Sequence, residues 1–439
     1  MTVRGSVNSK VTVFEQHPDD GVSLRRKICI LSLSDIANDP RVRRQGDALH
    51  IAGWSVVGVG LPNPTEDRPP WSILSQVLPT KSSYNKFGER LRQYPAVRWS
   101  RKQVARIFHV LASLKVRIQP EHGISAYWAW YWPWPHVRQI YDLATSITAD
   151  VWLANDWVML PVAARLAKER GGMYAYDTHE LATDEYQERL RWRLIRRPFV
   201  KVIEGHFIRG AQHVSCVSHG IAVRLQELYE LQRTPLVIRN IPKYSAAAFR
   251  PTGNNIRVLY HGIIAPKRGL EQAIESVPAW RRDFSFTIRG IGTANYMTSI
   301  QDRIDKLRLQ GRVQIVPPVP MTELVRAAMP FDIGLFALPA HSLHNMFALP
   351  NKFFEYIMAG LALCISDLPE MTNLLRAYNL GTIIARVDPD AIATAINSVD
   401  SKAIEVFKRN SLKAALELNW ENESQKMVRA YESEFKHAK

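Results

Sequence analysis

The stretch from Leu349 to Glu370 holds the residues whose types and spacing best suit the binding of a polar ligand. Pro350 suits the first position of a helix, an apolar helix is predicted over 353–359, and Gly360 suits its left-handed C-terminal cap. Amides at the start of such a helix carry partial positive charge and lack partners, which suits a phosphate. Glu355 can accept hydrogen bonds from two adjacent hydroxyls of a ribose or a hexose, or it can stabilise the helix dipole; both roles stay open.

A second phosphate-binding arrangement lies where a predicted strand, 256–262, runs into a glycine loop. Lys267 and Arg268 stand in this loop directly before Gly269, and a helix is predicted from Leu270. A pair of cations in front of a helix N-terminus offers both charge and N–H donors to a phosphate. The loop is therefore a candidate anion site.

His179 and Glu180 directly follow a predicted strand at 173–177. Open α/β sheets place their ligand-binding groups at the carboxyl ends of strands, so both residues occupy a suitable position. A structural histidine with its hydrogen bonds satisfied is the alternative interpretation for His179.

The motif PNKFFEY-x3-G at 350–360 resembles the nucleotide-sugar signature of the family 4 glycosyltransferases, which have the GT-B fold of two facing Rossmann-like domains. The resemblance implies that amides around Pro350, Asn351 and Lys352 face the donor diphosphate and that Glu355 binds the ribose. The family pattern has a second glutamate eight positions earlier, where this chain has Phe347.

Three further segments resemble the same family, and each implies a role. DPRVRRQ with a helix ending in AGW is similar to the first loop and helix, which implies that Asp35 and Arg41 lie on the acceptor side. DTHE is similar to the histidine loop, which implies that His179 and Glu180 face the reaction centre. The G-x5-[KR]-G element implies donor binding by Gly262, Lys267 and Arg268, although Ile263 stands where the family often has arginine.

The elements that must position these residues form two series of alternating strands and helices. The first series opens with a strand at 27–33 and a helix from Pro40 with Asp39 as its cap. It lacks GxGxxG, so no dinucleotide is indicated. Asp388-Pro389-Asp390 is interpreted as a cap and first turn rather than a metal motif.

The expected fold is α/β of the GT-B type, with two facing Rossmann-like domains and a C-terminal helix that crosses back to the first domain. The predicted parts are a flexible arm (1–24), an acceptor-side domain (25–244), a nucleotide-sugar-binding domain (245–418) and the returning helix (419–439). The chain of 439 residues is long enough to bury two cores.

Composition narrows the class of protein further. Hydrophobic residues make up 46% and charged residues 22%, which is typical of a globular chain. Cys29, Cys216 and Cys364 lie in separate apolar runs, which predicts free thiols in a reducing cytoplasm. We expect no signal peptide, because the first residues are polar, and no transmembrane span.

The net charge of +16 calls for an anionic partner. Residues 81–120 carry ten bases and one acid among aromatic side chains, residues 189–201 carry six bases and no acid, and tryptophans cluster at 128–134. Such mixtures suit an anionic membrane surface, while packing inside a core and stacking on single-stranded nucleic acid are the alternatives. We expect a membrane surface and no nucleic acid.

The resemblance to the family thus implies a retaining glycosyltransferase that moves a sugar from a nucleoside diphosphate to a glycan or lipid-linked acceptor. The expected location is the cytoplasmic face of the cell membrane, and no metal or other cofactor is expected. Two alternatives stay open: another GT-B enzyme, such as an epimerase or phosphorylase, and a non-catalytic GT-B partner protein. For a phosphorylase, no pyridoxal lysine site is identifiable.

Overall fold

The computed structural model describes residues 26–62, 68–76, 111, 124, 131–187 and 189–436, with the side chains of 434–436 excepted. The chain divides into two compact units. Unit 1 comprises residues 1–216, 222–236 and 428–439, and unit 2 comprises residues 217–221 and 237–427. The predicted basic segment 81–120 and Trp128 and Trp130 lie outside the described residues.

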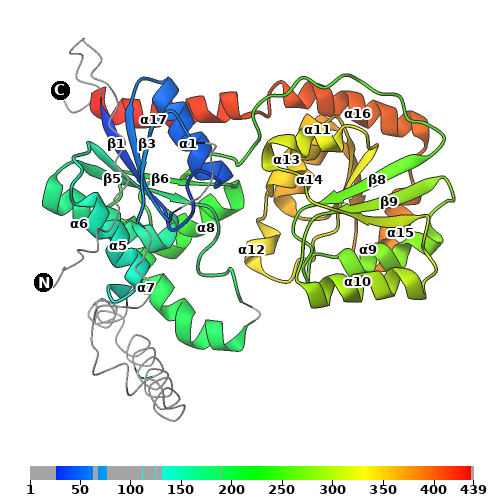
Figure 1. Cartoon of the computed structure of the whole chain (residues 1–439), viewed down its shortest axis with the longest axis horizontal. Helices are drawn as coiled ribbons and strands as arrows, with labels where there is room; N and C mark the ends of the chain where they lie inside the picture. Colours follow the sequence, from blue (N-terminus) through cyan, green and yellow to red (C-terminus); the bar gives the residue numbers. More distant parts are fainter. Residues whose placement is uncertain are drawn as a thin grey trace, which may run out of the picture. The chain divides into compact units, whose positions relative to one another are not determined.

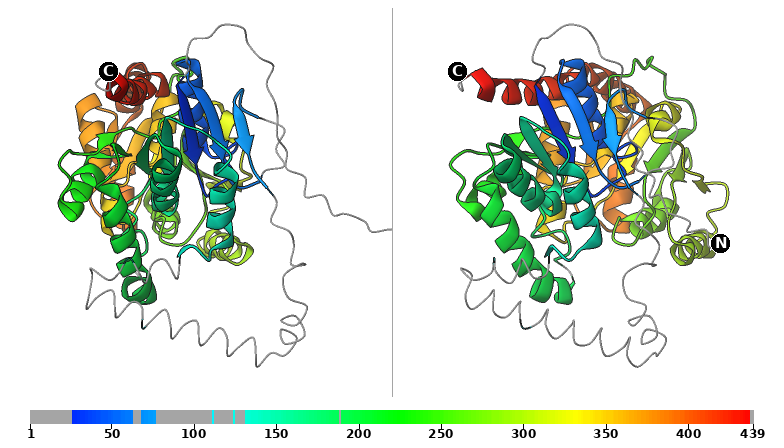
Figure 2. Two further views of the ribbon diagram at one scale, coloured as in Figure 1. Left: turned by 90° about the vertical axis from the view of Figure 1, so that its left-hand side faces the viewer. Right: turned by 60° about the vertical axis from the view of Figure 1, so that its left-hand side comes forward.

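Unit 1 is built on a seven-stranded sheet of order β3-β2-β1-β4-β5-β6-β7 (Figure 1). The strands are β1 (Lys27–Leu31), β2 (Ser55–Val59), β3 (Ser72–Leu74), β4 (Val151–Asn155), β5 (Met173–Thr178), β6 (His213–Cys216) and β7 (Leu236–Val237). From β3 to β6 every neighbouring pair is parallel, and the blue strands of Figure 2 show one edge of the sheet. The strand order reverses between β1 and β4, which is where open parallel sheets bind ligands.

Helices connect these strands as expected for parallel sheets. They are α1 (Pro40–Ile51), α5 (Pro135–Ala144), α6 (Asp156–Arg170), the π-helix η2 (Trp192–Arg196), α7 (Arg197–Ile208) and α8 (His219–Tyr229). Asp39 caps α1 by accepting hydrogen bonds from the amides of Arg41 and Val42, which confirms the predicted cap. α6 packs against β4 and β5, so the ends of these two strands lie side by side.

Unit 2 repeats the topology with a six-stranded sheet of order β10-β9-β8-β11-β12-β13, in which every pair is parallel. The strands are β8 (Ile256–His261), β9 (Phe284–Arg289), β10 (Val313–Val316), β11 (Ile333–Phe336), β12 (Ala362–Ser366) and β13 (Gly381–Ile384). Here the order reverses between β8 and β11. Each unit therefore has the doubly wound order of a Rossmann-like fold.

The helices of unit 2 alternate with its strands, and the last of them, α17, contributes residues to both units. They are α9 (Leu270–Ser276), η3 (Val277–Ala279), α10 (Ala294–Lys306), η4 (Met321–Glu323), α11 (Leu324–Ala328), α12 (Leu343–Met346), α13 (Asn351–Met358), α14 (Pro369–Tyr378), α15 (Pro389–Asn397), α16 (Ser401–Ala415) and α17 (Trp420–Lys436). Asp388 caps α15 by accepting from the amide of Ala391, which confirms its predicted structural role. No described helix is long and apolar enough to cross a membrane.

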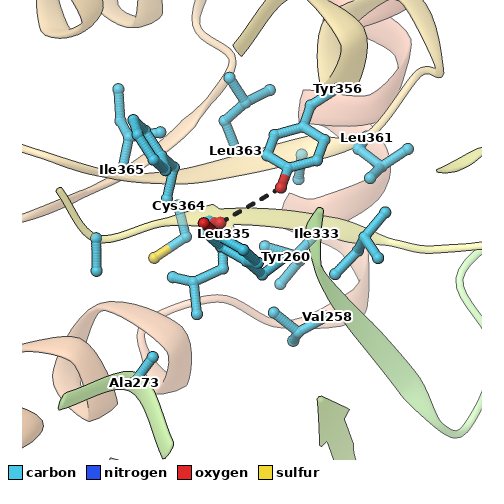
Figure 3. Close-up of a cluster of buried hydrophobic side chains, with 14 of the residues drawn as sticks. Val258, Tyr260, Ala273, Ile333, Leu335, Tyr356, Leu361, Leu363, Cys364 and Ile365 are labelled. Atoms are coloured by element: carbon cyan, nitrogen blue, oxygen red, sulfur yellow. Dashed lines mark hydrogen bonds between the residues drawn. The ribbon is translucent and has the colours of Figure 1, made fainter. Parts of the chain in front are cut away.

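The core of unit 2 fixes the orientation of α13, the helix that carries Glu355. Tyr356 is fully buried, and its ring lies where Gly334 of β11 has no side chain: a Cβ there would be 2.3 Å from the ring. Its hydroxyl accepts a hydrogen bond from the amide of His261 and lies 3.5 Å from the carbonyl oxygen of Leu335 (Figure 3). Because Tyr356 is locked on the sheet, the residues one turn earlier in α13 are held at the ends of β8 and β11.

The helix predicted over 353–359 begins two residues earlier and ends one residue earlier than expected. The helix begins at Asn351, and Pro350 lies before it in extended conformation, with φ −76° and ψ 154°. The extended conformation is the usual one for a cap residue, so the first helical amides belong to Asn351 and Lys352. Gly360 has φ 71°, which confirms the predicted left-handed C-terminus.

Candidate active site

In unit 2, the predicted donor-binding residues converge at the reversal of strand order. Gly262 directly follows β8, and the loop 262–269 ends at Gly269, where α9 begins. Gly269 has φ 74°, and a Cβ on it would lie 1.8 Å from the carbonyl oxygen of Ala337, the residue after β11. The glycine thus allows the loop to lie directly against the end of β11.

The cations of this loop face solvent. Lys267 and Arg268 are exposed, and Lys267 adopts a left-handed conformation with φ 65°. A positive φ is costly for lysine, and such strain concentrates at functional sites. Arg268 lies one residue before Gly269 and close enough to influence Tyr260 and Lys352 electrostatically. The anion site at this loop stays a prediction.

Lys352 joins these cations from α13. Its ammonium group lies 4.0 Å from the ring centroid of Tyr260 in β8 and 4.6 Å from that of Phe336 in β11. Burial and the charge of Arg268 lower the pKa of Lys352 to about 7, against the opposing effect of Glu355. At α13 no side chain caps the N-terminus, so the amides of Asn351 and Lys352 remain available to a ligand.

Glu355 lies beside a buried histidine at the end of β8. Its Oε2 lies 2.8 Å from Nε2 of His261, the last residue of β8, and its side chain is 13% exposed. The ring of His261 is buried and stacks on Tyr356 at 4.7 Å, so the imidazole cannot swing away from the carboxylate. His261 thus holds a fixed place beside Glu355, although neither of its ring nitrogens makes a hydrogen bond within the described part of the chain.

Phe347 and Ile263, the two departures from the family pattern, have different surroundings. The ring of Phe347 packs on Gly220, where an added Cβ would lie 2.2 Å from it. The carbonyl oxygen of Phe347 accepts a hydrogen bond from the hydroxyl of Ser218 at 2.8 Å. Ile263 is 63% exposed beside the glycine loop and provides no charge there.

In unit 1, a buried carboxylate organises the ends of three elements. Asp177, at the end of β5, is fully buried and accepts two hydrogen bonds of 2.6 Å from the guanidinium of Arg41. Gln45 donates to it at 2.7 Å and Ser215 at 2.5 Å. Burial alone would raise the pKa of Asp177, but Arg41 and His179 hold it well below its ordinary value.

His179 lies beside this carboxylate. Its Nε2 is 3.0 Å from Oδ1 of Asn155 and 3.3 Å from Oδ2 of Asp177, while Nδ1 is 3.5 Å from Oδ2 of Asp156. Burial lowers the pKa of His179, but the carboxylates of Asp156 and Asp177 outweigh it and raise the pKa to about 9. His179 is thus an imidazolium at neutral pH, and because 3.5 Å is long for a hydrogen bond, its Nδ1–H can turn to a ligand oxygen.

Three other predicted residues have distinct places in unit 1. Arg41 is 1% exposed and bound to Asp177, so its guanidinium faces the interior of unit 1 and not solvent. Asp35 accepts from the side chain of Asn38, and its Oδ1 is buried without a partner among the described residues. The backbone carbonyl of Glu180 accepts from the hydroxyl of Thr178, and its side chain is half-buried.

The sequence interpretation assigned no role to His261, Asn155, Asp156 or Asp177, although a signal was present. Asn155 and Asp177 end adjacent parallel strands, where polar side chains meet. Asp156 has φ 64°, a strained conformation for aspartate that the sequence does not reveal. Within the described ranges, no group of three or more His, Cys, Asp or Glu residues could hold a metal ion.

The sequence and the fold resemble those of known glycosyltransferases. Residues 245–413 match the family described as "Glycosyl transferases group 1". Sucrose-phosphate synthase from Thermosynechococcus elongatus superimposes with a TM-score of 0.64 at 15% identity, covering 94% of this chain and 100% of that one. A glycosyltransferase from Rickettsia africae gives 0.62 at 12% identity, covering 94% and 99%. Anabaena HepE in complex with UDP and glucose gives 0.63 at 12% identity, covering 93% and 100%.

These structural neighbours share the GT-B fold over nearly the whole chain. No curated protein matches the sequence significantly. The chain has the GT-B fold, and residues 245–413 of its second unit match the group 1 glycosyltransferase family.

Proposed function

We propose that this protein transfers a sugar from a nucleoside diphosphate to an acceptor hydroxyl, as a retaining enzyme of the family 4 type that needs no metal. The observation that carries the proposal is the convergence of Arg268, Lys352 and the uncapped start of α13 at the strand-order reversal of unit 2. These groups provide two cations and free amides, which a diphosphate requires.

The chemical task is to stabilise the leaving diphosphate. As the bond between the sugar C1 and the diphosphate oxygen breaks, negative charge grows on that oxygen, and Arg268, Lys267 and the α13 amides would stabilise it. The acceptor oxygen then bonds to C1 and passes its proton to the leaving diphosphate. Glu355, beside His261, is proposed to bind the two ribose hydroxyls through Oε1.

Unit 1 is proposed to orient the sugar and receive the acceptor. The imidazolium of His179 can donate from Nδ1 to a sugar hydroxyl, which suits positioning better than proton abstraction because its pKa is raised to about 9. Glu180 and Asp35 remain the acceptor-side candidates, whereas Arg41 would act indirectly by holding Asp177. UDP and UDP-glucose complexes of similar structures support a nucleotide-sugar donor.

A panel of nucleotides and sugar nucleotides tests this proposal. Calorimetry should show binding of at least one of UDP, GDP and ADP, and the matching sugar nucleotide should be turned over. Arg268→Ala should weaken that binding by about 1.5–3 kcal/mol, the scale of a charge-assisted hydrogen bond. Arg376→Ala, in the last turn of α14, is the matched control. Unchanged affinity in Arg268→Ala would place the diphosphate elsewhere.

A non-catalytic GT-B protein is the second candidate, favoured by Phe347 and Ile263. It would bind the nucleotide but turn over no sugar nucleotide of the panel, so the same experiment separates the two functions. Phe347→Glu provides a further test: a large gain in turnover would show that the native protein is an enzyme with impaired catalytic activity.

We also propose that the acceptor is lipid-linked or a cell-surface polysaccharide precursor and that unit 1 docks on an anionic membrane at the cytoplasmic face. The support is the segment 189–196, in which Arg191 and Arg193 are exposed and Leu190 and Leu194 are 59% and 43% exposed. Arginines interleaved with exposed leucines suit an anionic headgroup layer.

The described aromatic residues at 131–134 support this surface less than expected. Tyr131 is fully buried, and Trp132 lies edge-on to Tyr141 and beneath the guanidinium of Arg165. Flotation with anionic vesicles should retain the protein at low salt and release it at high salt. Leu190→Ser with Leu194→Ser should remove any salt-resistant fraction; a protein that never floats at low salt has no such surface.

A further inference from the structure

The side chain of Lys352 is held in an unusual way for a lysine. Its ammonium is placed over two aromatic rings, Tyr260 from β8 and Phe336 from β11, at 4.0 and 4.6 Å. These strands flank the reversal of strand order in unit 2, so the charge lies at the position where such sheets bind ligands. Among the described residues, Lys352 has neither an ion pair nor a hydrogen bond through its side chain.

Ring faces attract the ammonium but accept no conventional hydrogen bonds from its three N–H donors. The nearby carboxylate of Glu355 does not neutralise it by contact, because that carboxylate is 2.8 Å from His261. A half-buried ammonium that keeps its donors unused is suited to an anion that arrives from solvent.

The glycine loop is adapted to this lysine. A Cβ on Gly262 would lie 2.9 Å from Nζ of Lys352, and Gly262 has φ 123°, so a side chain at this position would displace the ammonium. The next residue, Ile263, is 63% exposed and uncharged. At residues 262 and 263 the loop therefore provides space but no cation, and the nearby cation is Lys352 of α13.

We propose that Lys352 is the second diphosphate-binding cation of the donor site, taking the place that Ile263 leaves without charge, and that donor binding adds a proton to it. The inference rests on the proposed function and specifies how that site is regulated by pH.

The groups that face Lys352 determine the direction of the pH effect. Burial and Arg268 lower the pKa of Lys352 to about 7, and Glu355 opposes them. Tyr260, with its pKa raised to about 12 mainly by burial, stays neutral, and Tyr356 of α13 stays neutral for the same reason. His261 is paired with Glu355. In the empty site the lysine thus loses its proton as the pH rises above 7, and a bound phosphate favours the protonated form.

Calorimetry with UDP, or with whichever nucleoside diphosphate of the panel binds, tests the proposal between pH 7.5 and 9. The affinity of the native protein should fall by up to about tenfold per pH unit, and titrations in two buffers of different ionisation enthalpy should show net proton uptake. Lys352→Met should bind at least about tenfold more weakly at pH 7.5, with no proton uptake and a flat pH dependence. Lys402→Met, in the first turn of α16, is the matched control and should behave as the native protein.

Gly262→Ala provides a second variant, which keeps Lys352 in the sequence but displaces its ammonium group. It should weaken binding in the same direction, and combining it with Lys352→Met should add little, because both changes remove one interaction. Far-ultraviolet circular dichroism establishes that each variant is folded, and inorganic pyrophosphate repeats the comparison without the nucleoside.

The outcomes separate the two proposals. The inference is wrong if the native protein binds the nucleotide and Lys352→Met binds it with unchanged affinity. It is also wrong if the pH dependence persists in Lys352→Met. Either result leaves the proposed function standing. Absence of binding by the native protein to every nucleoside diphosphate and to pyrophosphate overturns both. The inference and the proposed function are both supported if Lys352→Met binds weakly and independently of pH while Lys402→Met binds like the native protein.

Discussion

Replacing Arg41 by methionine tests whether this arginine contacts the acceptor, as its position in the sequence suggests, or supports the site from inside unit 1. The guanidinium is 1% exposed, and the carboxylate of Asp177 that it binds is fully buried. In Arg41→Met the two hydrogen bonds of 2.6 Å disappear, and a buried carboxylate loses its main counter-charge.

The expected loss is about 3–5 kcal/mol in the free energy of unfolding, the cost of leaving one partner of a buried ion pair without the other. Arg43, on the same helix, provides the comparison: it pairs with Asp47 four residues later, with side chains 17% and 14% exposed. Arg43 also donates to the carbonyl oxygen of Ala37. Arg43→Met should therefore cost less than Arg41→Met, on the order of 1 kcal/mol, because no fully buried carboxylate is left unpaired. Comparing the losses in the free energy of unfolding for these two arginines of one helix distinguishes the effect of burial from the effect of removing a charge.

Urea unfolding followed by circular dichroism measures both variants. Adding Asp177→Asn to Arg41→Met should recover part of the loss, because it removes the uncompensated charge while Gln45 and Ser215 keep a polar partner. A loss below about 1 kcal/mol in Arg41→Met, together with a higher KM for the acceptor, would refute the supporting role and restore a direct contact.

Two further predictions concern titratable groups of unit 1. Burial raises the pKa of Glu204 from 4.5 to about 7 although two tyrosine hydroxyls donate to it at 2.6 Å, so its protonated form is favoured by folding. The stability that Glu204 contributes is present below pH 4.5 and is lost as the pH rises to about 7; urea unfolding across this window should show a decline that Glu204→Gln removes. Asp156→Asn should lower the pKa of His179 from about 9 toward its ordinary value of 6.5, as measured by proton NMR titration, and an unchanged pKa would mean that Asp156 does not determine this charge.

Much of the fold could be predicted from local patterns. The strands predicted at 27–33, 173–177 and 256–262 are present, and their ends differ from the expected bounds by one or two residues. The helix caps could also be predicted, because Asp39 and Asp388 each precede a proline. An aspartate followed by a proline favours a helix start through local backbone chemistry alone. The short strand β3 and the π-helix η2 were not predicted, since neither has a periodic pattern of its own.

The geometry of the candidate site was harder to predict from the sequence, because it depends on contacts between residues that are far apart in the chain. Glu355 and His261 are 94 positions apart, and only the register of β8 and the buried ring of Tyr356 bring them together. Arg41 and Asp177 are separated by 136 positions. A pattern of residue types identifies strand ends where ligands bind, but it does not show which charge is already paired inside the fold.

Phe347 shows how such a pairing explains a departure from a family pattern. Glu370 of α14 accepts hydrogen bonds from the amides of Gly220 and His219 at 2.5 and 3.3 Å, so the start of α8 already has a carboxylate cap. The ring of Phe347 lies against the same glycine, and Ser218 donates to its backbone carbonyl. A glutamate at 347 would bring a second carboxylate toward amides that Glu370 occupies and would lose the apolar contact with Gly220. At this position the chain packs the segment 217–221 with an aromatic ring, and any carboxylate contact to the donor sugar must come from elsewhere in the site.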